Sequence, residues 1–147
     1  MSNEARVNSS LQITVGKLTY SSQPSAFTAD VSAAGGYGPT PGRVLATIPG
    51  ASVDLSKLTI LGGFVRVQNM DSTNFIQLGM YDPDTGKTYW FMDLLPGETF
   101  IFRLSRSYAN EVVGSGTTGG NVAYRVRVDP TATYGSTAYC LFEAFDR

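Results

Sequence analysis

The chain has 147 residues, a formal net charge of −1 and no histidine. The length fits one domain with a real core, and the near-neutral charge argues against a nucleic-acid-binding surface, which normally carries a basic excess. Without histidine, the Ser-His and Cys-His arrangements of nucleophilic catalysis and the commonest zinc ligand are excluded. One cysteine, Cys140, allows no internal disulfide and fits a reduced compartment. We expect it to be a small packed residue of the last strand.

The first residues, Met1 to Arg6, contain no apolar segment of the kind found in signal peptides. No apolar run approaches the roughly 20 residues that a membrane-spanning helix needs. We therefore expect a soluble protein that is made in the cytoplasm and has no membrane partner.

The N-terminal part is predicted to be an arm followed by a first strand. Residues Met1 to Ser10 are polar and lack periodicity, which predicts a flexible arm, so that a single sandwich domain would cover residues 11–147. Apolar residues then occupy odd positions before Gly16 and even positions after it: Leu11, Ile13, Val15, Leu18 and Tyr20. The glycine at the change of phase predicts a β-bulge in this strand.

The longest irregular stretch is predicted from Ser21 to Gly42, and its second half consists of small residues around Tyr37. A loop of this length is usually functional or disordered. Two interpretations remain open, an ordered surface excursion and a loop that lies on a neighbouring subunit with Tyr37 as its anchor. A short strand is predicted next, over Arg43 to Ile48.

The centre of the chain, Thr59 to Arg106, predicts four consecutive strands joined by tight turns. These strands are expected over Phe64 to Gln68, Phe75 to Tyr81, Lys87 to Asp93 and Thr99 to Leu104. In the fourth strand, Phe100, Phe102 and Leu104 are predicted to point inward and Ile101 and Arg103 outward.

Two further strands, Val122 to Val128 and Ala138 to Phe145, are expected to close the fold. About eight strands with turns at regular spacing predict an all-β protein. Long crossovers favour an antiparallel β-sandwich of jelly-roll type.

Three patterns suggest ligand or catalytic sites, and each has a simpler interpretation. Residues 114–119 match GxGxxG, but a strand follows them where a nucleotide site needs a helix. Asp82 to Gly86 begins like a calcium loop, but Lys87 and Asp93 stand where an EF-hand needs glycine and glutamate, so a hairpin turn is favoured. Paired carboxylates could hydrolyse glycosides, but most acids lie at turn positions. We therefore expect no enzymatic activity, catalytic residue, metal or cofactor.

The segment from Asn69 to Gly79, the turn Leu95-Pro96-Gly97-Glu98 and the strand Phe102 to Ser105 resemble small β-sandwich structural proteins of tailed-phage virions. Sheets of that family carry an N-x-D-x-T-N strand pattern and an L-x-P-G-E turn before an R-L strand. The resemblance covers roughly Leu11 to Arg106 and implies a non-enzymatic virion protein, most plausibly a capsid decoration (cement) protein assembled in the host cytoplasm. The family supplies no catalytic residues.

The resemblance also implies the partners. They would be the major capsid protein or other virion proteins and further copies of the chain, in a homotrimer, without direct contact to nucleic acid. We expect residues 1–10 and 35–42 to reach neighbouring subunits. The candidate interface residues are Arg6, Tyr37, Pro39, Pro41, Arg43 and Tyr108.

The alternative is an adhesive module of a tail or head fibre that binds carbohydrate. In that case Trp90 is the candidate for stacking on a sugar ring. A core position for Trp90 would remove the best anchor of this alternative.

Overall fold

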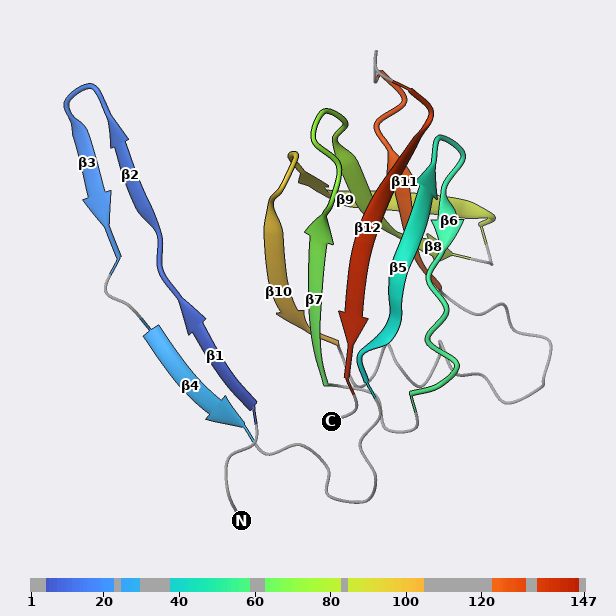
Figure 1. Ribbon diagram of the computed structural model, residues 1–147, viewed down its shortest axis with the longest axis horizontal. Helices are drawn as coiled ribbons and strands as arrows, with labels where there is room; N and C mark the ends of the chain where they lie inside the picture. The colour runs from blue at the N-terminus through green and yellow to red at the C-terminus, as the bar shows by residue number, and fades with distance from the viewer. Residues whose placement is uncertain are drawn as a thin grey trace. The chain divides into compact units, whose positions relative to one another are not determined.

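The computed structural model describes residues 5–22, 25–29, 38–58, 63–82, 85–104, 123–131 and 135–145 (Figure 1). The chain divides into two compact units, Met1–Ala33 and Ala34–Arg147. Secondary structure in the described residues consists of strands and turns, which confirms the all-β prediction.

The first unit is a two-stranded antiparallel ribbon. β1 (Ala5–Ser9) pairs with β4 (Ser25–Ala29), and β2 (Gln12–Val15) pairs with β3 (Leu18–Ser21). The tip is a two-residue turn in which Gly16 has a φ of 57°. Glycine at the first central position is the usual choice of a type II′ hairpin turn.

The second unit is built on an eight-stranded mixed sheet, in which seven strands follow the order β10-β7-β12-β5-β11-β8-β9 and the eighth, β6, pairs with β11. Its strands are β5 (Thr40–Thr47), β6 (Ala51–Ser52), β7 (Phe64–Asn69), β8 (Ile76–Asp82), β9 (Lys87–Leu94), β10 (Thr99–Arg103), β11 (Ala123–Val128) and β12 (Thr137–Ala144). All pairings given for these strands are antiparallel except the short parallel one between β5 and β11.

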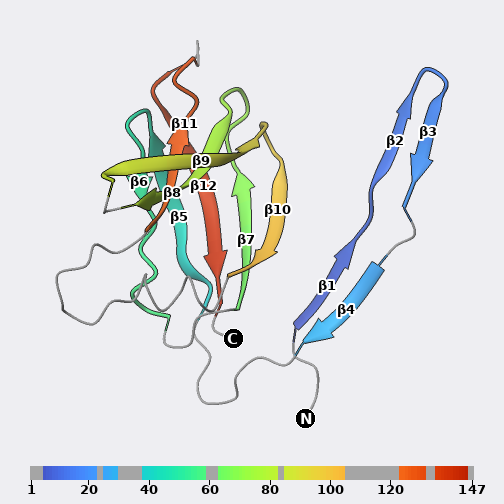
Figure 2. The ribbon, with the colours of Figure 1, turned by 180° about the vertical axis from the view of Figure 1, so that it is seen from behind.

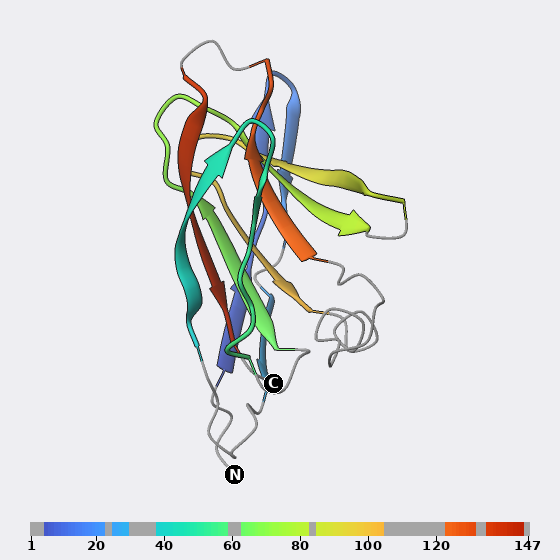
Figure 3. The ribbon, with the colours of Figure 1, turned by 90° about the vertical axis from the view of Figure 1, so that its right-hand side faces the viewer.

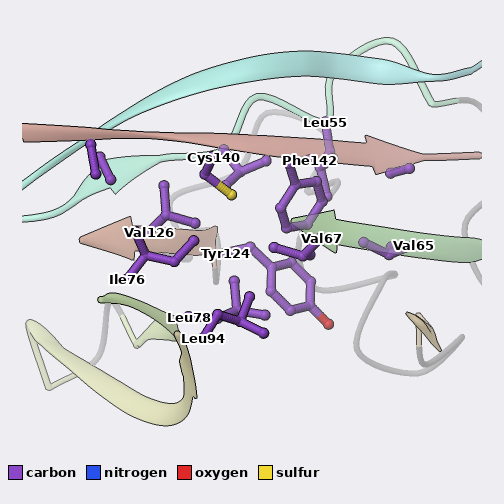
Figure 4. Close-up of a cluster of buried hydrophobic side chains, with 14 of the residues drawn as sticks. Leu55, Val65, Val67, Ile76, Leu78, Leu94, Tyr124, Val126, Cys140 and Phe142 are labelled. Atoms are coloured by element: carbon purple, nitrogen blue, oxygen red, sulfur yellow. The ribbon is translucent and has the colours of Figure 1, made fainter. Parts of the chain in front are cut away.

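The sheet curls into a sandwich-like body, so that its β10-β7-β12-β5 half faces its β11-β8-β9 half (Figure 3). The core lies between the halves (Figure 4). There Tyr124 of β11 contacts both Phe102 of β10 and Phe142 of β12, with ring centroids 6.0 and 6.1 Å apart. Seen from behind, β9 crosses the body and leads into β10 (Figure 2).

The predicted strands of the centre and the C-terminal part are confirmed to within a few residues. Burial alternates along β7, where Val65 and Val67 are fully buried, as the period-two pattern indicates. Phe100 points to the inner side as predicted, since it pairs with the buried Val67 and stacks beside Phe102 at 5.8 Å, but its side chain remains exposed. β10 lies at the end of the sheet path and pairs only with β7, so little covers the first part of this strand.

The N-terminal predictions need correction. The arm expected over residues 1–10 contains strand β1, and the first unit extends to Ala33 instead of ending at Ser10. Gly16 closes a hairpin and does not form a bulge. Within the stretch expected to be irregular from Ser21 to Gly42, the structure has β4 and the start of β5. The reason is the same throughout: each of these segments gains a pairing partner that a local pattern does not show.

Candidate functional site

The β2–β3 hairpin carries its apolar side chains on one face. Residues that are paired across two antiparallel strands point to the same side of the ribbon. Ile13 pairs with Tyr20, and Val15 pairs with Leu18. Leu11 continues the series, because its carbonyl accepts from the amide of Ser22 and its own amide donates to the Ser22 hydroxyl. We call the set Leu11, Ile13, Val15, Leu18 and Tyr20 the hairpin face.

The opposite side of the hairpin is polar, since Gln12 pairs with Ser21 and Thr14 with Thr19. One charged residue occurs between residues 11 and 22, and this is Lys17 in the turn. The hairpin is therefore amphipathic, with an uncharged apolar face that the turn glycine aligns across both strands.

The hairpin face is exposed. Val15 is 70 % exposed, Leu18 59 %, Leu11 54 % and Tyr20 50 %. A two-stranded hairpin is marginally stable in water unless a further layer or strand covers its apolar side. Contiguous exposed apolar surface usually marks a site of protein or membrane interaction. The hairpin face is thus the strongest candidate binding surface among the described residues.

A second apolar surface lies on the outer side of the body. Tyr139 of β12 pairs with Leu45 of β5 on one side, and on the other side its carbonyl accepts from the amide of Met70. All three side chains are exposed. We call Met70, Tyr139 and Leu45 the outer row.

The charges near the outer row are already engaged. The Arg43 guanidinium lies 3.4 Å from the centroid of the Tyr139 ring, a cation–π contact. On the same side of the sheet, Arg66 forms an ion pair with Glu143 at 2.7 Å and donates to Gln68. A partner that covers the outer row would therefore contact a neutralised Arg66–Glu143 pair and the Arg43 guanidinium stacked on Tyr139.

Of the six predicted interface residues, the structure describes four. Arg6 is exposed on β1, Pro39 is exposed before β5, and Pro41 is half-buried opposite Glu143. Arg43 is exposed and lies on Tyr139. Tyr37 and Tyr108 lie outside the described residues, as do residues 35–37 of the predicted contact loop, residues 35–42.

Trp90 is half-buried on β9 and stacked. The Arg127 guanidinium lies 4.2 Å from its ring centroid, and Arg127 is held in place by a 2.7 Å hydrogen bond to Gln77. The ring also lies over Gly79 and Gly50, where an added Cβ would approach it to 2.5 and 3.0 Å. A sugar could stack on the face that Arg127 covers only by displacing this guanidinium.

The motif that carries the resemblance to virion proteins forms a hydrogen-bond network around the buried Asn69. Its side-chain amide donates to the carbonyls of Asn74 (2.8 Å) and Leu94 (3.0 Å), and its oxygen accepts from the amide of Asp71 (2.9 Å). Its backbone pairs with Gly97 and Glu98. Asn69 therefore joins the two motif segments, N-x-D-x-T-N and L-x-P-G-E, which lie on different strands.

Two carboxylates of these motifs shape their own loops. Asp71 accepts from the amides of Thr73 and Asn74, and these hydrogen bonds lower the pKa of the Asp71 carboxyl. Glu98 accepts from the Leu95 amide at 2.8 Å and closes the turn between β9 and β10. In this structure, both carboxylates have a local structural role.

Two further predicted residues also have structural surroundings. Asp82 accepts from the hydroxyl of Thr85 at 2.9 Å, as in a hairpin turn. Cys140 is fully buried between β5 and β7, and burial raises the pKa of its thiol to about 12. Its prediction as a packed residue is confirmed.

The described residues contain no helix that is long and apolar enough to span a membrane. In the same part of the chain, no three residues among Asp, Glu and Cys gather as metal ligands would. Comparison with protein-family models, with curated proteins and with solved structures found no match.

Sequence reasoning found the hairpin residues but missed their common face. The available signal was the switch from odd to even apolar positions across Gly16-Lys17, which is what a two-residue turn requires. The outer row gave no such signal, because its three members come from separate parts of the chain.

Proposed function

We propose that this protein is a non-enzymatic structural component of a tailed-phage virion and that it binds the capsid as a decoration (cement) protein. The observation that carries the proposal is the hairpin face, the apolar side of an amphipathic ribbon that has no covering layer among the described residues of its own unit. Such a surface serves to bind a protein partner and needs no chemistry at the contact.

The body suits this role as a support. Hydrogen bonds of Asn69 join β7 to the end of β9 and to the turn at Glu98, and a ring contact links Tyr124 to Phe142. A rigid body with an apolar arm can join neighbouring subunits of a shell. Many shallow contacts of this kind, multiplied by avidity, would then resist the internal pressure of packaged DNA.

Co-sedimentation with capsids tests the proposal. The probe is capsids assembled from the major capsid protein of the same source, mixed with wild-type protein, with Val15→Asp or with the matched control Thr14→Asp on the polar side of the hairpin. We expect wild type and Thr14→Asp to pellet with capsids and Val15→Asp to remain largely in the supernatant. Wild-type protein that stays in the supernatant at all ratios would refute the proposal.

A further inference from the structure

A partner of the hairpin face should present apolar side chains, because the hairpin face itself is apolar and carries no charge. The outer row of this same chain is such a surface. The outer row is apolar, exposed and flanked by charges that are already stacked or paired. The hairpin face has no charged member, and Lys17 lies at the tip of the ribbon. Contact between the two surfaces would therefore bury one charge without a counter-ion, the Arg43 guanidinium, and this charge would keep its stacking on the Tyr139 ring.

We propose that the hairpin face of one copy packs on the outer row of a second copy, and that the exchange is reciprocal. The hairpin would gain the covering layer that an isolated two-stranded ribbon lacks. The outer row would lose its contact with water. A reciprocal contact of this kind is isologous, so it closes as a dimer, in place of the homotrimer that the resemblance implies, and does not propagate into fibres.

The apolar area of the hairpin face and the outer row favours a reciprocal contact between two copies. Fully burying one large apolar side chain removes on the order of 60–120 Å² from water. The eight side chains of the two surfaces are roughly half exposed, so each copy offers on the order of 250–500 Å². Two copies together offer about 500–1,000 Å² of apolar area. Specific interfaces bury about 1,200–2,000 Å² in total, of which somewhat more than half is apolar. A single hairpin-to-row contact would supply only half of the estimated area.

The inference deepens the proposed function by assigning the hairpin face to a second copy, so that the joined pair and not the single chain would bind the capsid, and it rests on that proposal only for the biological role. Its test uses no capsids. A wild-type protein that binds capsids but does not self-associate would overturn the inference alone. Self-association without capsid binding would overturn the proposed function alone.

The mass in solution is measured first, by light scattering over a concentration series. We expect wild type to dimerise and Val15→Asp to weaken the association by at least about tenfold, because a carboxylate would enter an apolar contact. Thr14→Asp on the polar side should associate like wild type. A wild type that stays monomeric throughout, or a Thr14→Asp protein that is as weak as Val15→Asp, would overturn the inference.

Cross-linking with a short bismaleimide then identifies the two surfaces. Leu18→Cys protein is mixed with a size-tagged Leu45→Cys protein, and Thr19→Cys on the polar side replaces Leu18→Cys in the control. The native thiol of Cys140 is buried and should not react with the bismaleimide. We expect a mixed dimer with Leu18→Cys but not with Thr19→Cys.

Two other products would contradict the inference. A Leu18→Cys homodimer in place of the mixed dimer would show that hairpins pack on each other. A linked monomer of the Leu18→Cys/Leu45→Cys double variant, without a mixed dimer, would show that the hairpin binds the body of its own chain.

Discussion

Replacing Asn69 with alanine should destabilise the body strongly, because Asn69 is fully buried and makes three side-chain hydrogen bonds. Each neutral hydrogen bond contributes about 1 kcal/mol net, and a buried group left without its partner costs about 1–3 kcal/mol. The carbonyls of Asn74 and Leu94 would both lose a donor. We expect the free energy of unfolding to fall by about 3–5 kcal/mol, a large share of the 5–15 kcal/mol that is typical of a domain.

Urea unfolding followed by the fluorescence of Trp90, the single tryptophan, measures this change. With a slope of about 1–3 kcal/mol per molar urea, the midpoint should fall by roughly 1–5 M. Gln68→Ala, on the neighbouring outward position, is the control and should cost less than about 1 kcal/mol. An Asn69→Ala midpoint that coincides with that of Gln68→Ala would refute the reasoning.

The variant Asn69→Asp separates hydrogen bonding from shape. Its carboxylate has nearly the size of the amide but cannot donate to the carbonyls of Asn74 and Leu94. Burial beside these oxygens should raise its pKa in the folded state above the unfolded value of about 3.9. A raised folded pKa favours folding at low pH, so this variant should regain stability relative to wild type as the pH falls. A deficit that does not change with pH would contradict this account.

Three further results are expected. Gly79→Ala should destabilise the body and shift the emission of Trp90, because the added Cβ would approach the ring to 2.5 Å; unchanged emission and stability would contradict this. Ellman's reagent at pH 8 should modify Cys140 only on unfolding, since burial raises its pKa to about 12; rapid labelling of the native protein would contradict this. The lowered pKa of Asp71 stabilises the fold above about pH 4, so the stability advantage of wild type over Asp71→Asn should shrink as the pH falls through that region, measured by urea unfolding across pH.

The strands of the body could be predicted because alternation is a local signal. Successive side chains point to opposite faces of a strand, so apolar and polar residues alternate along a strand that is buried on one face. Val65 and Val67 on β7 and Val126 and Val128 on β11 follow this rule and are fully buried. Phe100 points to the same side as Val67, as the rule requires, but it stays exposed because an edge strand is covered incompletely.

The roles of the motif residues depended on tertiary structure. In the sequence, Asn69 begins a turn and Leu95 to Glu98 form another turn. In the structure, the two turns meet, and the amide of Asn69 spans them. The residue types of each segment predict that it forms a turn. They do not predict that the two turns contact each other, since this contact depends on pairing between distant strands.

The sequence by itself therefore determined the fold class, most strand positions and the absence of histidine chemistry. Tertiary structure decided which residues share a surface. The hairpin face arises because β2 and β3 pair in one register, and the outer row because β7, β12 and β5 lie side by side. The physical reason is that burial along one strand is a local property of the chain, whereas neighbourhood across strands is fixed only when the backbone hydrogen bonds form.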